Sequence, residues 1–427
     1  MRPSGLSGIS AVCGVVVAIL APAPAGASGF NLYEQSAEGL SLGSAVSAST
    51  TEPAAAYYNP AALAFLPGAQ ASAGGIAYFA SERFTLKGSG AETAAAPVRS
   101  FIPTVFATAR VADRVGVGLG VFSNIGLGLE WPDAWVGRRY GIKGSMQTAT
   151  INPVVAYRLH DTLSVAAGVD VMRAALDLTS GLPAPFDGAV RLGGATWGFG
   201  GNLGVLYRPR PGRLHVALAY RSRIKLVFDG RADFSGLPPE LASKPELADQ
   251  AGSVSLTAPD MLTLGVMVRP TPSLTLGCDG VALFWSVHQE IRLQFAQAPD
   301  AAFRPRYHDA MSVRLGADWA TPLRGLSLRA GFAFDQKAAP EDGLSPLLPE
   351  SHTLDVSAGV GYARGRFKVD LGYMLVNSLP STATPPADAA LAQSPAGTYH
   401  ARVHLLGIGV TVRSSGPAPA SAVARAP

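Results

Sequence analysis

Charged residues are scarce in this chain, and their scarcity limits what the protein can be. Asp, Glu, Lys and Arg make up 15% of the 427 residues, against roughly 25% in an ordinary soluble domain, while hydrophobic residues make up 48%. So apolar a composition excludes an intrinsically disordered chain. The 34 basic and 30 acidic residues leave a net charge of +4, which is too weak and too evenly spread for a nucleic-acid binding protein.

Cysteines and catalytic motifs are also nearly absent. The 2 cysteines, Cys13 and Cys278, exclude a disulfide framework and a cysteine-based metal cage. Gly39–Gly43 matches G-x-S-x-G, but no strand precedes it, as a nucleophile elbow requires. His400 and His404 would lie about 13 Å apart on one strand, too far to share a metal ion. We therefore expect no cofactor, no metal and no catalysis; an enzyme is a minor alternative.

Hydrophobic runs long enough to cross a membrane as a helix are missing beyond the N-terminus. There, Arg2 precedes an apolar run over Ala11–Ala21 and then Ala25-Gly26-Ala27, the pattern of a secretory signal peptide with its cleavage site. A lipoprotein signal would place the apolar run before Cys13 rather than after it. We predict that residues 1–27 are a signal peptide and that the mature chain begins at Ser28.

Apolar residues alternate with polar ones through the rest of the chain. Leu354–Tyr362 carries Leu, Val, Ala, Val and Tyr on one face and Asp, Ser and Gly on the other, and Leu326–Asp335 and Phe367–Tyr373 repeat the pattern. This period of two predicts β-strands, and the 48 glycines and 33 prolines, which interrupt long helices, agree with it. The polar face includes full charges: Asp170, Arg314, Asp318, Arg329, Asp335, Asp355, Lys368 and Asp370.

Strand length and connections distinguish a membrane barrel from a soluble β-sandwich, in which strands also alternate. Many segments approach the roughly nine to eleven residues that cross a bilayer as a tilted strand. Tight turns are expected at 112–114, 159–162, 208–213, 269–273, 320–325 and 363–366, with longer loops between them, as in outer-membrane barrels. We therefore predict an all-β fold, a 14-stranded antiparallel transmembrane β-barrel over residues 71–412, in the bacterial outer membrane.

Aromatic residues near the expected strand ends suit the interfacial girdles of such a barrel. They are Trp131, Trp135 and Tyr140 around one loop, and Tyr157, Tyr207, Tyr220, Trp285, Trp319, Tyr362 and Tyr373.

Residues 28–70 do not fit the barrel, because they are too long for a free start and too apolar for a linker. Here the sequence resembles a known family. Ser28–Ala37 (SGFNLYEQSA) and Tyr57–Leu63 (YYNPAAL) resemble the N-terminal hatch of the FadL/TodX family of outer-membrane transporters of long-chain fatty acids or aromatic hydrocarbons. Further segments follow in family order: 123–127, 135–140, 151–158, 220–222, 329–332 and 397–400.

The resemblance implies a hatch that plugs the barrel lumen, with Asn59, Pro60 and Ala61 packed beside a kinked third strand. It places the kink at Ser123, Asn124 and Gly126, where it would form a lateral gate through which an apolar ligand leaves for the membrane. Gly126 and the Asn124 amide independently suit a break in strand pairing, and Pro60 fixes the backbone of the hatch. Without the resemblance, Asn59-Pro60 equally reads as an ordinary turn.

The implied function is passive uptake of hydrophobic small molecules, with outer-membrane lipid as the other partner, no nucleic acid, and a monomeric state. A general diffusion porin or a structural barrel is the alternative. Candidate ligand contacts are Phe30, Leu182, Phe186, Leu237, Arg314, Arg329 and Lys368. The loop residues Leu182, Phe186 and Leu237 would capture ligand or simply pack together. The lumen bases would hold a carboxylate, although ion pairs with the acids on the same strands are favoured.

The C-terminal segment departs from the family pattern. The predicted last strand ends at Val412 without the terminal aromatic residue that barrels of this class usually carry. We expect the Pro/Ala-rich residues 413–427 to be disordered.

Overall fold

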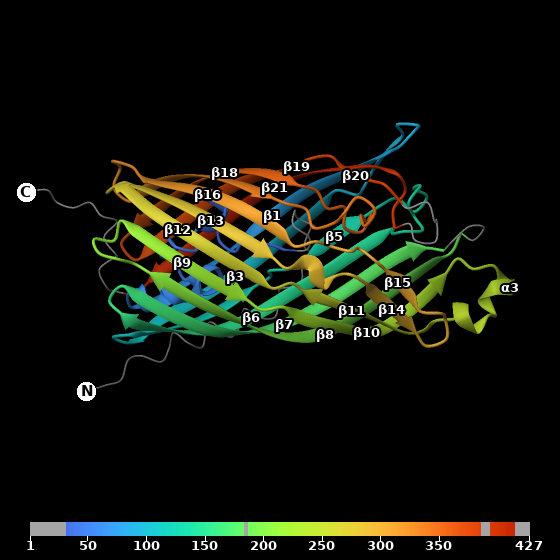
Figure 1. Ribbon diagram of the computed structural model, residues 1–427, viewed down its shortest axis with the longest axis horizontal. Coiled ribbons are helices and arrows are strands. Elements are labelled where there is room, and N and C mark those ends of the chain that lie inside the picture. The colour runs from blue at the N-terminus through green and yellow to red at the C-terminus, as the bar shows by residue number, and fades with distance from the viewer. Residues whose placement is uncertain (1–30, 183–186, 386–392, 415–427) are drawn as a thin grey trace, which may run out of the picture.

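The computed structural model describes residues 31–182, 187–385 and 393–414, which form a closed antiparallel barrel (Figure 1). The wall has 14 strands, as predicted, and closes where β1 pairs with both β3 and β21. The continuous strands are β1 (Ala69–Leu86), β3 (Val98–Ala112), β6 (Lys143–His160), β7 (Leu163–Gly181), β8 (Ala189–Tyr207), β17 (Leu326–Asp335), β18 (Thr353–Arg364), β19 (Phe367–Ser378) and β21 (Gly397–Arg413).

Five wall strands are each interrupted once. They are β4 (Val115–Phe122) with β5 (Leu127–Glu130), β9 (Leu214–Arg221) with β10 (Ile224–Ser235), β11 (Gln250–Ala258) with β12 (Met261–Thr271), β13 (Leu274–Leu283) with β14 (Ile291–Phe295), and β15 (Ala301–Phe303) with β16 (Ala310–Ala320). Short β2 (Glu92–Ala94) and β20 (Ser381–Ala383) extend two of the loops. In η3, residues Trp285–Val287 form one short turn after β13.

The two ends of the barrel differ as the turn pattern predicts. The six tight turns join neighbouring strands at one end, on the left in Figure 1, and the longer loops lie at the other end. Those loops include α3 (Pro239–Ala242) and η2 (Pro245–Leu247). Residues 1–30 and 415–427, which hold the predicted signal peptide, Phe30 and most of the predicted disordered tail, lie outside the described residues.

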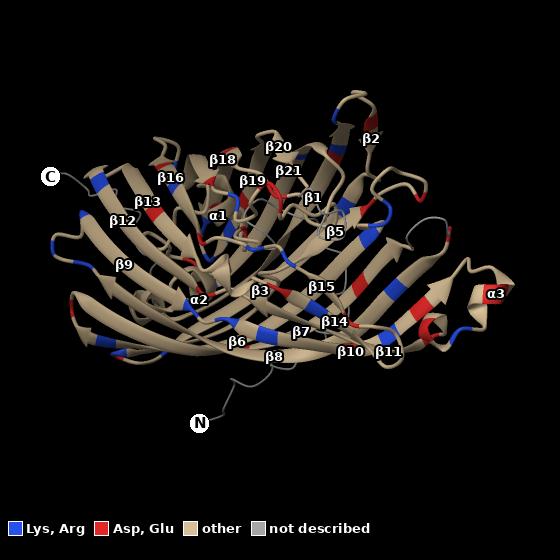
Figure 2. Cartoon of the chain, turned by 45° about the vertical axis from the view of Figure 1, so that its right-hand side comes forward, with Lys and Arg blue, Asp and Glu red and all other residues tan. Residues whose placement is uncertain are grey.

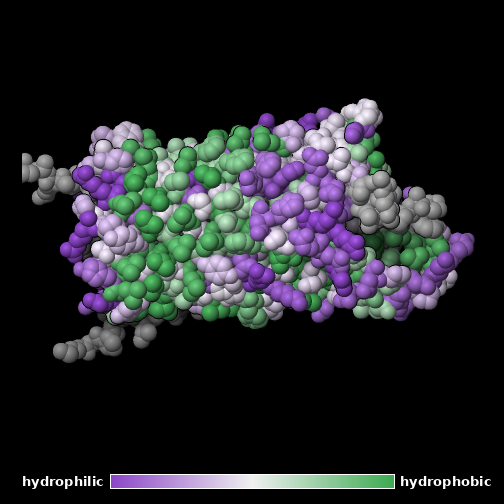
Figure 3. Space-filling view, in the orientation of Figure 1, coloured by the Kyte–Doolittle hydropathy of each residue, from purple (hydrophilic) through white to green (hydrophobic). Residues whose placement is uncertain are grey.

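The outer face carries a hydrophobic belt (Figure 3). Because side chains alternate along a strand, Leu119, Leu203 and Leu371 point outward and are 42 to 55% exposed. The expected girdle residues Tyr157, Tyr207, Trp319, Tyr362 and Tyr373 are exposed too. Trp131, Trp135 and Trp285 are not, since they are 1 to 4% exposed and pack in the interior, so their assignment to a girdle is wrong. None of the described helices is long and apolar enough to span a membrane.

The N-terminal segment folds inside the barrel as a hatch, which confirms the plugged architecture. It contains α1 (Ala37–Ser41), α2 (Ala55–Tyr58) and the 3-10 helix η1 (Pro60–Phe65). The Ser36 hydroxyl caps α1 by accepting from Gly39 N at 2.9 Å, and Asn59 Oδ1 caps η1 by accepting from Ala61 N at 3.1 Å. Helix α1 lies against β17, β18, β19 and β21, where a side chain at Gly331 would collide with the backbone of Leu42 and Gly43.

A second segment covers the lumen from the loop end. The connection between β17 and β18, residues 336–352, crosses from that side of the barrel to β5 and β6, where Trp131 Nε1 donates to Pro346 O at 2.8 Å. Leu344 and Leu348 of this loop are 1 and 4% exposed and join the interior cluster that includes Trp131 and Trp135. The lumen is therefore filled from both ends.

Candidate functional site: a window in the barrel wall

The third wall strand separates from the second over part of its length. Pairing between β3 and β4 ends at Val105 and Val121, and beyond that level β5 pairs with β6. The two strands meet again only where Ala96 N donates to Glu130 O at 2.7 Å. Between these points, residues 98–104 face residues 123–129 with no ladder pairing among the described residues. We call this gap the wall window.

A one-residue insertion in strand 3 creates the window. Phe122 pairs with Thr150 and Leu127 with Met146, so the four residues 123–126 lie opposite the three residues 147–149. This is a β-bulge, and it reverses which side chains point inward. Phe122 faces the lumen before the bulge and Leu127 and Leu129 face it afterwards. The interruption therefore lies where Ser123, Asn124 and Gly126 were expected to place it.

The first described residues of the hatch hold the bulge from inside. Asn31 forms a bridge with Ile125, and Leu32 N donates to Asn124 O at 3.0 Å. The Gln35 amide donates to Leu32 O at 2.7 Å and to Ser123 O at 2.9 Å. These bonds satisfy backbone groups that the missing β3 partner leaves open.

The Asn59-Pro60-Ala61 motif makes its hydrogen bonds to strands other than the third. The 3-10 helix η1, which contains Pro60 and Ala61, also contacts β4 of the third wall strand. Asn59 Nδ2 donates to Val205 O at 3.1 Å, and Ser164 Oγ donates to Ala61 O at 2.8 Å, so the motif lies against β7 and β8. The preceding residues make the connection to the window instead. The Tyr58 hydroxyl accepts from Gln35 N at 3.0 Å, and the Tyr57 ring packs on Phe122 with centroids 5.1 Å apart.

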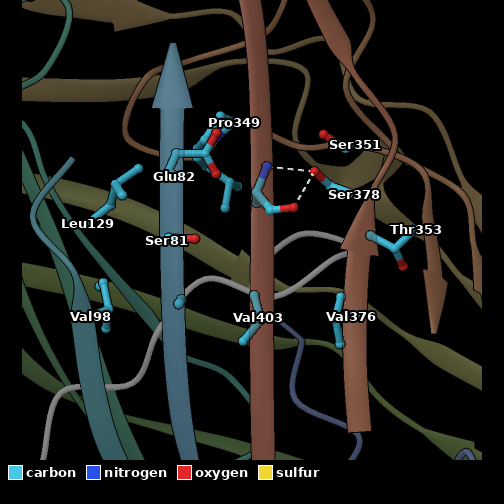
Figure 4. A pocket seen from close by; sticks show the side chains of 14 residues that line it. Ser81, Glu82, Val98, Leu129, Pro349, Ser351, Thr353, Val376, Ser378 and Val403 are labelled. Atoms are coloured by element: carbon cyan, nitrogen blue, oxygen red, sulfur yellow. Dashed lines mark hydrogen bonds between the residues drawn. The ribbon is translucent and has the colours of Figure 1, made fainter. Parts of the chain in front are cut away.

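Cavities lie on both sides of the window. The outer one has a volume of about 440 Å³ and is lined by outward-facing residues such as Arg99, Glu130 and Gln147. The inner one has about 40 Å³ and lies in the lumen among β1, β19, β21 and the 336–352 loop (Figure 4). Val98, Gly128 and Leu129 line both. The two cavities are thus separated only at the window itself.

A third cavity continues the inner one toward the hatch. It has about 20 Å³, shares Val376 and Val403 with the inner cavity, and is bounded by hatch residues 31–34. The three cavities form one row from the hatch, through the lumen, to the outer face of the wall.

The window straddles the outer edge of the hydrophobic belt. Phe79, Phe101 and Trp197 are 42 to 54% exposed and lie at that edge. The next outward residue of β3 is Arg99, which pairs across from Phe79. A molecule leaving here would enter the membrane at the level where apolar and polar layers meet.

Basic and acidic residues both occur along the barrel strands (Figure 2). The lumen bases proposed as ligand contacts are paired with acids. Arg314 pairs with Asp335 at 2.9 Å. Arg329 pairs with Asp370 at 2.7 Å and Asp318 at 3.1 Å, and reaches Glu38 of the hatch at 3.3 Å. Lys368 contacts Glu38 and lies 3.0 Å from Asp370. The ion-pair interpretation therefore describes this structure, and the three bases join the hatch to the wall.

The surroundings of two hatch carboxyls in this network shift their pKa values in opposite directions. Burial raises the pKa of Glu38, but Lys368 and Arg329 outweigh burial and lower it to about 2. Burial and the neighbouring Glu38 carboxylate raise the pKa of Glu52 to about 7. With Asp370 these acids form a compact group, and the Lys368 ammonium lies among them.

The two described loop residues proposed for capture come together. Leu182 and Leu237 both approach Gly188, and each is half-buried. Phe186 lies outside the described residues. The structure therefore shows packing between the two loops and leaves part of each leucine accessible.

Comparison with known proteins identifies the family. The family described as outer membrane protein transport protein (OMPP1/FadL/TodX) matches residues 17–413. The chain belongs to this family. The members of the OMPP1/FadL/TodX family are outer-membrane transport proteins rather than enzymes, and this barrel is accordingly an outer-membrane protein.

Curated relatives and solved structures match this chain over most of its length. The long-chain fatty acid transport protein of Escherichia coli O6:H1 is 27% identical over 391 residues, covering 82% of this chain and 86% of the relative. Outer membrane protein P1 of Haemophilus influenzae is 27% identical over 409 residues, covering 83% and 87%. A Pseudomonas aeruginosa FadL homologue has a TM-score of 0.82 at 18% identity, covering 90% of this chain and all of that one.

A second solved structure belongs to the hydrocarbon branch of the family. The P. putida toluene transporter TodX has a TM-score of 0.68 at 18% identity, covering 87% of this chain and 97% of that one. These similarities establish the fold, with fatty-acid and aromatic-hydrocarbon transporters both among the family members.

Sequence reasoning missed several residues of the site. Gln35 stood in the quoted hatch motif, but nothing in its local pattern indicates that its amide reaches strand 3. The alternation does place Glu82 on the inward face of the first strand. The sequence of residues 336–352 has no periodicity that would predict this loop to fold over Glu82.

Proposed function

We propose that this protein takes up hydrophobic molecules by capture at its outer loops, passage along the row of cavities, and lateral exit through the wall window. The observation that carries the proposal is the pair of cavities on opposite sides of one unpaired stretch of wall, sharing Val98, Gly128 and Leu129. Half-buried Leu182 and Leu237 offer a first apolar contact at the loop end.

Lateral exit suits an apolar cargo energetically. Each buried CH₂ gains about 0.8 kcal/mol, so a hydrophobic molecule in the window moves into lipid spontaneously. Outer-membrane lipid is then the acceptor, and one barrel is sufficient for the route. A general diffusion porin fits less well, because the hatch and the 336–352 loop fill the lumen.

Closing the window without touching the lumen tests the route. Gly128 lines both cavities, so Gly128→Trp should place an indole in the window. We expect uptake of radiolabelled toluene and tetradecanol by cells to fall at least about fivefold. The matched control is Gly193→Trp, on the outward face of β8, where a Cβ has ordinary room.

The control variant should transport within about twofold of the parent, and both variants should keep the heat-modifiable mobility of a folded barrel. A folded Gly128→Trp protein with parental uptake would exclude lateral exit and favour a straight path through the lumen.

A further inference from the structure

The two inner cavities are acidic. Glu82 lines the lumen cavity, and Glu34, Asp335 and Asp355 line the cavity beside the hatch. Among the described residues that line either one, there is neither a lysine nor an arginine. Arg314, which pairs with Asp335, lines neither cavity.

Polar atoms along this path lack partners within the described chain. Glu82 Oε1, the Ser351 hydroxyl and the Tyr78 hydroxyl are buried without a hydrogen bond, and their residues are 8, 4 and 3% exposed. Figure 4 shows Glu82 and Ser351 on opposite sides of the lumen cavity, near Pro349 and Ser378. Buried polar groups normally have partners, so such a concentration beside an empty space points to a ligand that supplies them.

Apolar side chains line the path as well, beside further polar residues such as Ser81, Thr353 and Ser378. Val98, Val376, Val403 and Leu405 line the cavities between the polar groups. At about 40 and 20 Å³, the cavities hold only a small group in this state. Each has one wall outside the barrel strands, the 336–352 loop for the first and hatch residues 31–34 for the second, and these walls must move for a longer molecule to pass.

We propose that this path selects uncharged hydrophobic molecules that carry a hydroxyl group, such as long-chain alcohols or phenols, and turns away fatty-acid anions. The inference deepens the proposed function and rests on it. In the lumen cavity a hydroxyl donates to Glu82 or accepts from Ser351, and in the cavity beside the hatch it accepts from Tyr78. A carboxylate would place a negative charge beside the acidic side chain of Glu82, in a dry space whose described lining residues include no compensating cation, which is strongly unfavourable.

The selectivity residue in this scheme is Glu82. It lines the lumen cavity together with Val98 and Leu129, which also line the outer cavity, so a molecule that leaves the lumen cavity through the window lies beside Glu82 first. The lumen bases cannot replace the missing cation, because Arg329 and Lys368 are engaged by Glu38 and Asp370.

The test compares three ligands with the same chain and different heads. Purified protein in amphipol is titrated at pH 7.5 with radiolabelled tetradecanol, tetradecanoate and tetradecylamine. We expect tetradecanol to bind at least about tenfold more tightly than tetradecanoate. Glu82→Gln should improve tetradecanoate binding about fivefold or more and change tetradecanol binding less than threefold. Glu240→Gln, the same substitution in exposed α3, is the control and should change neither.

The outcomes separate the two proposals. If tetradecanoate binds as tightly as tetradecanol and Glu82→Gln changes nothing, the cavities hold only water and the selectivity inference is wrong, while lateral uptake stands. If tetradecylamine binds tenfold more tightly than tetradecanol, the path selects cations and the inference is also wrong. If no ligand binds to the parent or to either variant, the proposed function itself fails.

Discussion

Glu52 shows how the interior of the barrel alters a single carboxyl group. It lies 4.0 Å from Lys368, but burial and the Glu38 carboxylate dominate and raise its pKa to about 7. A raised pKa means that the folded hatch holds this proton more tightly than the unfolded chain does. The associated stability is complete below about pH 4.5 and is lost as the pH rises to about 7.

Glu52→Gln should therefore stabilise the hatch at pH 8 by up to about 3 kcal/mol and have almost no effect at pH 4. Hydrogen exchange of hatch amides, measured for parent and variant at each pH, gives the difference directly. A difference that does not depend on pH would show that Glu52 is ionised normally in the folded protein.

Asp370 illustrates what sequence pattern reveals about a residue and what it leaves out. The alternation in Phe367–Tyr373 correctly predicts that Asp370 faces the lumen and Leu371 the membrane. It cannot predict that Asp370 holds both Arg329 and Lys368, nor that Glu38 completes the group. Arg329 lies on another strand, and Glu38 is more than three hundred positions away in the chain, so its distance depends on how the hatch folds.

The break in the third wall strand was placed at residues 123–126 by the family resemblance. Gly126 and the Asn124 amide supported that position independently, because both suit a break in strand pairing. The partner of the break did not follow, since the resemblance suggested Asn59-Pro60-Ala61, whereas the structure brings Asn31, Leu32 and Gln35 to the bulge. The breaks within strands 7 to 10 gave no comparable signal, and their segments looked like ordinary strands and loops.

Gln35→Ala should loosen the bulge. It removes two buried hydrogen bonds, to Leu32 O and Ser123 O, and leaves both carbonyls without this donor, which costs about 1 to 3 kcal/mol. We expect faster hydrogen exchange over residues 123–130 and little change in β7 and β8. Gln70→Ala, which removes a buried glutamine bonded to Pro67 O away from the window, is the control. Equal hydrogen-exchange rates at the bulge in the parent and in Gln35→Ala would show that Gln35 does not stabilise the bulge.

At the scale of the whole molecule, two separate segments close one lumen. Composition, signal pattern, turn spacing and alternation together predicted the 14-stranded wall, and the family resemblance implied its hatch. They did not predict the inward fold of residues 336–352, because a Gly/Pro-rich loop has no periodicity to show which way it turns.

Removing residues 31–66 should open the barrel to ions only in part, because the 336–352 loop still covers the other end. In planar bilayers, we expect small single-channel currents for this deletion. Replacing residues 339–349 with a short Gly/Ser linker as well should give larger currents, since a 14-stranded cylinder is wide enough to hold water. Currents as large with the first deletion alone would mean that the loop does not block the lumen.

The wall window depends on the number of residues in the bulge of strand 3. Four residues stand where three would keep the ladder with β6 in step. Loss of one of them would bring strand 3 back into phase and allow it to pair with β3 along its full length. An insertion of one residue thus distinguishes a continuously paired barrel wall from one with a lateral opening.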